Sequence, residues 1–260
     1  MENIVSVTLG KVENLWFNIV SSYSPLSIEF IGTLLVQTTF VWLLSLCYIS
    51  LDTLFPSFSQ RHKIQPAARQ PSRHDIWRCV VVVAQNQVLM SSIHLIQLLA
   101  LNRLGYRSSA YRVEASFPTV TEVFRDIILS GLMREVIYYY NHRLLHSSSR
   151  LYIQIHKKHH QFTAPFALAT QFAHPLEHLL TNVLPVTLPP EMLGSHVLTF
   201  WISMALHLFS AVTVHSGYDF FNNMAKAHDL HHEKFNLHYG TMGLLDWIHG
   251  TDKHKKDRKE

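Results

Sequence analysis

Hydrophobic positions gather in four long segments of this chain, which are residues 31–51, 79–102, 120–140 and 179–218. The first two segments carry no aspartate, glutamate, lysine or arginine. Because about 20 apolar residues in a helix are enough to cross the core of a bilayer, each of these two predicts a membrane-spanning helix. The second segment also contains polar side chains, which we expect to face other helices. They are Gln85, Asn86, Gln87 and His94.

The linker between the first two segments is basic. Residues 61–78 contain five lysine or arginine residues and a single acid, Asp75. Short loops rich in lysine and arginine stay on the cytosolic side of membranes. The first two spans therefore form a hairpin whose linker lies in the cytosol. The same rule predicts a cytosolic tail at residues 252–260, which are also basic.

The third and fourth segments are less regular. Residues 120–140 carry two arginines and three acids, so this stretch either spans the membrane beside other helices or lies in the interface. Residues 179–218 are broken near the middle by Pro185, Pro189, Pro190 and Gly194. Two helical arms that meet at this break enter the membrane and return on the same side. If residues 120–140 span the bilayer, the histidine motifs described below all lie on the cytosolic face.

Composition supports a membrane protein, because 48% of residues are hydrophobic and only 15% are charged, against about a quarter in soluble domains. We therefore predict an all-α integral membrane bundle of about four transmembrane helices. Residues 1–118 form an N-terminal membrane hairpin region and residues 119–260 form the catalytic domain. The basic residues fall in the linker and the tail, where membrane orientation explains them, so nucleic acid is not an expected partner.

Histidine is the residue type that carries the chemistry. The chain has 19 histidines, and 16 of them lie at or beyond His142. Its two cysteines, Cys47 and Cys79, exclude a four-thiolate zinc site, an iron–sulfur cluster and a disulfide framework. A metal site in this protein is therefore expected to use imidazole ligands.

Eight of these histidines fall into three motifs. The sequence HRLLH places His142 and His146 on one face of a helix, one turn apart, where both can bind one ion. Two H-x-x-H-H motifs follow, in HKKHH and HDLHH. Residues three and four apart share a helix face, while adjacent residues diverge by about 100°, so one such motif can hold two neighbouring ions. Eight imidazoles exceed what one ion needs and predict two metal ions. The motif residues after His146 are His156, His159, His160, His228, His231 and His232.

The nature of the metal follows from the ligand set. Zinc hydrolases of the zincin type need H-E-x-x-H, and soluble di-iron bundles need paired E-x-x-H motifs; neither string occurs here. An all-imidazole site for two metals inside a membrane protein favours iron with redox or oxygen chemistry. Imidazole also binds zinc well, so zinc can substitute in a preparation.

The order and spacing of these motifs resemble the membrane-bound fatty acid hydroxylase/sterol desaturase superfamily, and within it the C-4 methylsterol oxidases and the fatty acid hydroxylase domain-containing proteins. The shared elements are HRLLH, HKKHHQFTAPFALATQFAHPLEH, VHSGYD, HDLHHEKFNLHYG and LLDWIHGTD, which together span residues 138–252. The first hundred residues match only in having hydrophobic spans. The chain departs from the close sterol oxidases at the residue after HRLLH, in NLHYG and at His249, which leaves the substrate open but not the metal centre.

The resemblance implies that the eight motif histidines are iron ligands. It implies two further positions: His215 stands where relatives often have another ligand, and His174 is a family feature that either binds metal or supports a ligand. Relatives also carry a histidine four residues before His215, where this chain has Ala211. His178 and His207 are better explained as polar residues that face the bundle.

Acidic residues beside these histidines are candidates for hydrogen bonds that fix the tautomer of a ligand imidazole. We expect this role for Asp229, Asp219 and Glu177, and for Asp246 a surface ion pair is an equal alternative. A substrate tunnel lined by aromatic residues is a further possibility, with ordinary helix packing as the alternative explanation. Its residues are Gly217, Tyr218, Phe162, Phe166 and Phe172.

These features predict an oxidoreductase, an O2-dependent lipid monooxygenase similar to the C-4 methylsterol oxidases. The resemblance implies a multi-pass protein of the endoplasmic reticulum membrane with two iron ions and electrons from cytochrome b5 or an NAD(P)H reductase. No dinucleotide-binding G-x-G-x-x-G and no haem-attachment C-x-x-C-H occurs, so the electron donor is a separate protein. The alternatives are the same chemistry on a fatty acyl, sphingolipid, terpenoid or polyketide substrate, and a membrane protein that binds metal without catalysis.

Overall fold

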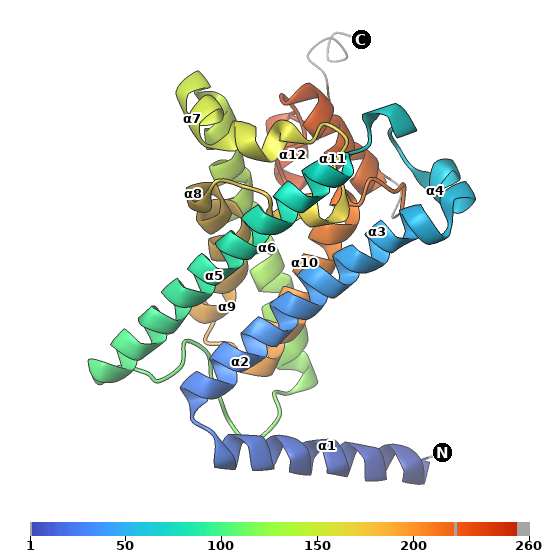
Figure 1. Cartoon of the computed structure of the whole chain (residues 1–260). Helices are drawn as coiled ribbons and strands as arrows, with labels where there is room; N and C mark the ends of the chain where they lie inside the picture. Colours follow the sequence, from blue (N-terminus) through green and yellow to red (C-terminus); the bar gives the residue numbers. More distant parts are fainter. Residues whose placement is uncertain (1, 221–222, 254–260) are drawn as a thin grey trace.

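The computed structural model describes residues 2–220 and 223–253. Over these residues all regular secondary structure is helical, and only two isolated β-bridges occur, so the predicted all-α class is confirmed. Residues 254–260 of the predicted basic tail lie outside the described part of the chain. Figure 1 shows long helices that run together toward one end of the molecule, where the short C-terminal helices gather, while the N-terminal helix lies across the opposite end.

Two long helices form the predicted N-terminal hairpin. The first is continuous from α2 (Pro25–Gln37) through a π-helical segment, η1 (Thr38–Leu43), into α3 (Leu44–Leu54). The second is α5 (Arg73–Arg103), which begins at a capping box formed by Ser72 and Asp75. Both helices are long and apolar enough to cross a membrane. The linker between them carries α4 (Pro56–His62) and the 3-10 helix η2 (Ala67–Arg69).

Of the four polar residues singled out on α5, three face the protein, as the pattern predicts. Asn86 is buried and donates hydrogen bonds to the carbonyls of Gln171 and Ala173, at 3.3 and 3.0 Å. Gln87 accepts a hydrogen bond from the Trp42 indole. Gln85 differs, because its side chain is exposed on the outer face of the helix.

The fourth apolar segment forms the expected helical hairpin, but it turns later than predicted. The first arm comprises α8 (Pro175–Glu177), the π-helix η5 (His178–Val183) and α9 (Leu184–Met192), and it continues through all three prolines. The chain reverses only at Gly194, whose φ of +61° favours glycine. The second arm is α10 (Val197–His215), the third helix that could span a membrane. Both flanks of the hairpin reach His159, through the Phe172 carbonyl and the His215 ring.

The charged segment at residues 120–140 belongs to one helix, α6 (Val120–Ser147). Its length of 28 residues corresponds to about 42 Å at 1.5 Å per residue, which is enough to cross a bilayer. Its charges leave it outside the three helices that meet both length and composition criteria. The buried Glu135 of this helix accepts hydrogen bonds from the backbone N–H groups of Thr241, Met242 and Leu245. Glu135 therefore fixes the C-terminal segment onto α6.

The helices pack around a core that both halves of the chain share. Residues of the N-terminal helices, such as Val41 and Val83, lie in one apolar cluster with Phe172 and Phe200. Helices α2 and α10 approach closely because a Cβ on Gly32 would overlap the Trp201 indole. The proposed division at residue 118 remains a prediction, and the two regions fold against each other.

The N-terminal helix α1 (Glu2–Ser22) is an element that the hydrophobic pattern did not predict. It lies across the end of the bundle away from the short C-terminal helices (Figure 1). Trp16 ties it to the bundle, because its indole donates to the Glu114 carbonyl at 2.8 Å and packs edge-on against Trp201. The remaining short helices, α7 (Ser149–Gln154), η3 (His156–Gln161), η4 (Ala167–Gln171), α11 (Asn223–Lys234) and α12 (Leu244–His249), lie toward the histidine-bearing end.

Candidate metal centre

Nine histidines form two clusters where α6, η3, α10 and α11 meet. In each cluster the possible ligand nitrogens all lie within 4.8 Å of one another. Cluster A consists of His142, His146, His156, His160 and His231. Cluster B consists of His159, His215, His228 and His232. The fold therefore brings together all eight predicted motif histidines and adds His215.

Each H-x-x-H-H motif serves both clusters, as its spacing predicts. In η3, His156 and His160 belong to cluster A while His159 points to cluster B. In α11 the division is reversed, with one residue in cluster A and two in cluster B. The first of these motifs is a 3-10 helix rather than an α-helix, yet the adjacent histidines still diverge enough to reach two centres.

Nitrogen–nitrogen distances suit metal ligation. In cluster A, the Nε2 atom of His156 lies 2.7 Å from that of His146 and 2.9 Å from that of His160. In cluster B, the Nε2 atom of His228 lies 2.9 Å from that of His215 and 3.1 Å from that of His232. Two nitrogens that bind one ion at about 2.1 Å, at right angles, lie about 3.0 Å apart. The spacing in both clusters matches that geometry.

Two cluster A rings have their tautomers set by the ring nitrogen that points away from the cluster. The Nδ1 atoms of His142 and His231 lie 2.8 and 2.6 Å from the backbone carbonyls of Tyr239 and Leu237. A carbonyl oxygen can only accept, so each Nδ1 carries the proton and each Nε2 presents a lone pair to the cluster. The Nε2 atom of His142 is buried and has no hydrogen-bond partner. Converging lone pairs repel one another, and a cation between them removes the repulsion, so the residues present fit a metal ion.

Electrostatics keep these rings neutral. Burial lowers the pKa of His159 to about 4, and burial together with the neighbouring histidines lowers the pKa values of His160, His228, His231 and His232 well below the ordinary value. Neutral imidazole is the form that binds metal. At neutral pH the clusters are therefore ready to accept ions without losing protons from these rings.

Among the predicted supporting carboxylates, Glu177 lies where we expected it. Its Oε1 atom is 2.7 Å from Nδ1 of His156, and both side chains are buried. Burial raises the pKa of Glu177 well above its ordinary range, which Lys158 partly opposes. The contact fixes the His156 ring with Nε2 toward cluster A. Glu177 therefore lies in the position that its predicted role requires.

The other acids lie elsewhere. Asp219 contacts Nδ1 of His62 at 3.2 Å and no cluster histidine within the described residues. Asp229 accepts a 2.6 Å hydrogen bond from Gln65, and its second oxygen is buried without a partner. Asp246 is neither a partner of a histidine nor a surface ion pair, because it accepts from the backbone N–H groups of Tyr239 and Gly240. It supports the metal centre indirectly, since the Tyr239 carbonyl orients His142.

The remaining predicted histidines lie outside both clusters. His174 caps α8, where its Nδ1 atom accepts from the backbone N–H of Leu176 at 3.2 Å. His178 is buried and accepts from the Asn182 amide at 3.1 Å. His207 contacts the Ser203 hydroxyl at 3.3 Å. The last two face the bundle, as expected, and His174 acts as a helix cap.

Sequence patterns did not identify several supporting groups. The carbonyls of Tyr239 and Leu237 orient cluster A from a segment in which His238 has a positive φ of 55°. Gly240 is needed there, because a Cβ would lie 2.6 Å from Glu135 and 2.8 Å from Asp246. Backbone carbonyls carry no sequence signature, although Gly240 and Gly243 mark a loop beside them.

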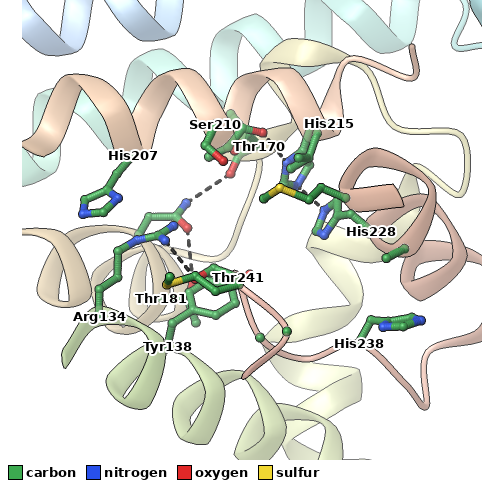
Figure 2. Close-up of a pocket in the computed structure, with 18 of the residues that line it drawn as sticks. Arg134, Tyr138, Thr170, Thr181, His207, Ser210, His215, His228, His238 and Thr241 are labelled. Carbon is green, nitrogen blue, oxygen red and sulfur yellow. Dashed lines mark hydrogen bonds between the residues drawn. The ribbon is translucent and has the colours of Figure 1, made fainter. Parts of the chain in front are cut away.

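A cavity of about 290 Å³ opens beside cluster B. His215 and His228 lie at one end of it, and Arg134 and His207 lie at the other (Figure 2). None of the five residues proposed as tunnel lining borders this cavity. Three of them, Phe162, Phe166 and Phe172, are core residues, and Tyr218 is buried with its hydroxyl bonded to Asp52. For these four side chains, packing is the explanation that the structure supports.

Comparisons with known proteins agree with this architecture. The fatty acid hydroxylase family profile matches residues 127–251. Fatty acid hydroxylase domain-containing protein 2 of Homo sapiens is 35% identical over 235 residues, which cover 88% of this chain and 68% of that protein. Methylsterol monooxygenase 2-2 of Arabidopsis thaliana is 29% identical, with 93% and 92% covered. Very-long-chain aldehyde decarbonylase GL1-8 of Oryza sativa subsp. indica is 28% identical, with 95% and 94% covered.

No solved structure matches the chain. The matched region contains all nine cluster histidines, and the similarity to whole relatives extends through the N-terminal helices. The names of the last two relatives describe enzymes that act on lipids, which agrees with the apolar helices and the histidine clusters found here. On sequence, fold and site, the chain belongs to the fatty acid hydroxylase/sterol desaturase family of lipid-modifying oxygenases.

Proposed function

We propose that the protein is a di-iron oxygenase of the endoplasmic reticulum membrane that hydroxylates a lipid, with the C-4 methyl groups of a sterol as the first substrate to test. The observation that carries this proposal is the pair of all-imidazole clusters beside a cavity in a membrane-helix bundle. The similarity to methylsterol monooxygenases over nearly their whole length supports the sterol substrate. Iron is proposed because an all-imidazole ligand set in this setting favours redox chemistry.

The residues of the chain have distinct tasks in this reaction. The nine cluster histidines would hold the two ions, and bound iron would supply the oxygen chemistry that no side chain can perform. Glu177 and the carbonyls of Tyr239 and Leu237 keep the rings of cluster A in the metal-binding orientation. The cavity beside His215 and His228 would place a lipid C–H bond next to cluster B and exclude bulk water.

Electrons must come from a partner. The described residues contain no haem or nucleotide motif, so we propose cytochrome b5 or an NAD(P)H reductase as the donor. The basic linker at residues 61–78 lies toward the histidine-bearing end of the bundle (Figure 1). Under the positive-inside rule this end would face the cytosol, where such donors act.

A different lipid is the second candidate. The similarity to very-long-chain aldehyde decarbonylases, and the departures from the sterol oxidase motifs, favour the same chemistry on an acyl, sphingolipid, terpenoid or polyketide substrate. Metal binding without catalysis is the remaining alternative, and the cavity beside cluster B counts against it.

The decisive experiment expresses the chain in membranes that lack the endogenous C-4 sterol oxidase and profiles lipids by mass spectrometry. Loss of accumulated 4-methylsterols supports the sterol substrate, whereas unchanged 4-methylsterols remove it. The matched control is His159→Ala, which removes a cluster B donor and is expected to abolish every product. Equal product formation by this variant would contradict the assigned centre.

A further inference from the structure

Arg134 is a charged residue that the proposed metal chemistry does not use. It lies in α6 at the wall of the cavity, beside Tyr138, Thr181 and Thr241 (Figure 2). A charged side chain buried inside a membrane protein is expensive and is a sign of function. The question is therefore what balances this charge.

The protein itself satisfies Arg134 only in part. One terminal nitrogen donates to the Thr241 hydroxyl at 2.9 Å, and the Nε atom is buried with no hydrogen-bond partner. No carboxylate lies within 4.0 Å of its guanidinium among residues 2–220 and 223–253. The neighbouring Glu135 is occupied by the backbone of the C-terminal segment. A guanidinium has five N–H donors, so most of its donor capacity is open.

Arg134 and His207 occupy equivalent positions on two neighbouring helices, each the same number of residues before a cluster histidine. On α6, Arg134 lies eight residues before His142, and on α10, His207 lies eight residues before His215. Both helices run toward the histidine-bearing end of the bundle (Figure 1). Eight residues correspond to about 12 Å at 1.5 Å per residue. The cavity thus has a polar level, defined by Arg134 and His207, and a metal level, defined by the cluster B residues His215 and His228. The two levels lie roughly two helical turns apart along the helices.

We propose that Arg134, with His207 at the same level, binds an oxygen atom of the lipid substrate and thereby selects the carbon that lies beside His215 and His228. This inference rests on the proposed oxygenase function, and between its two substrate candidates it favours a lipid whose oxygen is remote from the reacting carbon. The ligand is an elongated lipid with a hydroxyl, carbonyl or carboxylate oxygen remote from the carbon that reacts. An arginine suits this role because it donates several hydrogen bonds and its charge favours an acceptor oxygen.

The proposal separates two kinds of lipid. In a fatty acid or fatty alcohol the oxygen lies at one end of a chain, and the reacting carbon can lie one cavity length away. In a 4-methylsterol whose only oxygen is the 3-hydroxyl, that oxygen is adjacent to the reacting carbon and lies at the metal level. A steroid or terpenoid with an oxygen at its opposite end again satisfies Arg134.

The test measures binding to the purified full-length protein after metal removal with a chelator, so that it does not depend on turnover. The probes are palmitic acid, hexadecanol and hexadecane, and a 4,4-dimethyl steroid with or without a 17-ketone. We expect the oxygenated member of each series to bind wild-type protein more tightly. In Arg134→Met this preference is expected to fall by about tenfold to a hundredfold, as for the loss of a charged hydrogen bond. Arg134→Lys is expected to restore part of it for palmitic acid.

The matched control is Arg125→Met, which removes the same charge from the same helix. Arg125 is exposed, pairs with Asp126 and does not border the cavity. This control is expected to bind all probes as the wild type does. If the folded Arg134→Met protein retains the wild-type preference for oxygenated probes, the proposal is wrong.

A second measurement uses iron-loaded protein and the position of hydroxylation in the product. Arg134→Met is expected to raise KM and to spread hydroxylation over neighbouring carbons, while a merely structural role would lower kcat without moving the position. An unchanged product pattern overturns the Arg134 proposal and leaves the oxygenase intact. If the protein prefers the oxygenated probes but oxidises no lipid, the proposed function is overturned and the Arg134 subsite stands.

Discussion

Clusters A and B are built from the same residue type but differ in surroundings. Cluster A has five histidines, and three of their outer nitrogens contact Glu177 or a backbone carbonyl of the 237–239 segment. Cluster B has four histidines, of which His159 and His215 contact the carbonyls of Phe172 and Ala211. Only cluster B borders the cavity, through His215 and His228.

We infer from this difference that cluster A would retain its metal ion and that cluster B would be the site of reaction. More donors and firmer orientation favour tight metal binding at cluster A. Fewer donors and an adjacent cavity leave room for a substrate at cluster B. A catalytic metal site keeps an open position, whereas a closed ligand set is typical of sites that only retain the ion. The division of labour between the clusters can be tested in four ways.

The largest effect is expected from removing a donor of cluster B. In His228→Ala, turnover is expected to fall to background, while iron falls from about two ions to about one because cluster A keeps its full ligand set. Elemental analysis and product formation measure the two quantities. His74→Ala is the control, since His74 is exposed at the start of α5. Full activity of His228→Ala would contradict the division.

The next largest effect concerns the contact that orients His156. Glu177→Gln is expected to weaken metal binding at cluster A by roughly 10- to 100-fold, the usual effect of losing a partner that orients a ligand. Competition with a chelator measures the affinity. Asp219→Asn is the matched control, because Asp219 contacts His62 rather than a cluster histidine. Equal affinities in the two variants would remove Glu177 from its assigned role.

The third effect is a dependence of stability on pH in the metal-free protein. Burial lowers the folded pKa of His159 to about 4, below about 6.5 in the unfolded chain, so the unfolded state binds more protons in acid. Stability is therefore unaffected above pH 6.5 and falls as the pH drops toward 4. At pH 5 this residue alone lowers the free energy of unfolding by about 2 kcal/mol.

Thermal unfolding at several pH values measures this loss. Bound metal holds the rings neutral, so the iron-loaded protein is expected to resist acid better than the metal-free protein. Identical acid sensitivity of the two forms would show that the clusters do not carry the metal.

The smallest effect is expected from adding a donor to cluster B. Ala211 lies one turn before His215 on α10 and borders the cavity. Ala211→His places a ring on the same helix face, so the second ion is expected to bind a few times more tightly while the cavity shrinks. Metal titration and the KM of the lipid substrate separate these effects. Unchanged values for both would mean that the new ring points away from the cluster.

Much of this protein follows from spacing in the sequence. Uncharged runs long enough to cross a bilayer predicted α5 and the helix from α2 to α3, and the H-x-x-H-H spacing predicted that each motif serves two centres. Local geometry fixes these outcomes, because a helix determines which neighbours share a face. Glu177 was also predictable, since a carboxylate near a histidine motif is a natural partner for a ring.

Other features depend on contacts between distant segments. Asp219 and Glu177 both lie near histidine motifs, yet only the fold decides that Asp219 meets His62 instead. The prolines of α9 did not end the helix where the pattern predicted. Helix α1 was not predicted, because it contains no long apolar run. Sequence distance along the chain says little about distance in space once helices pack.

Sequence alone thus predicted the long apolar helices, the histidines that gather at one end and their division between two clusters, because these depend on composition and on helix periodicity. Tertiary structure decided which groups orient the rings, where the cavity lies and that Arg134 faces it. Those features arise where α6, α10 and the C-terminal segment meet. Backbone carbonyls and cavity walls belong to the packing of separate segments, and no single stretch of residues encodes them.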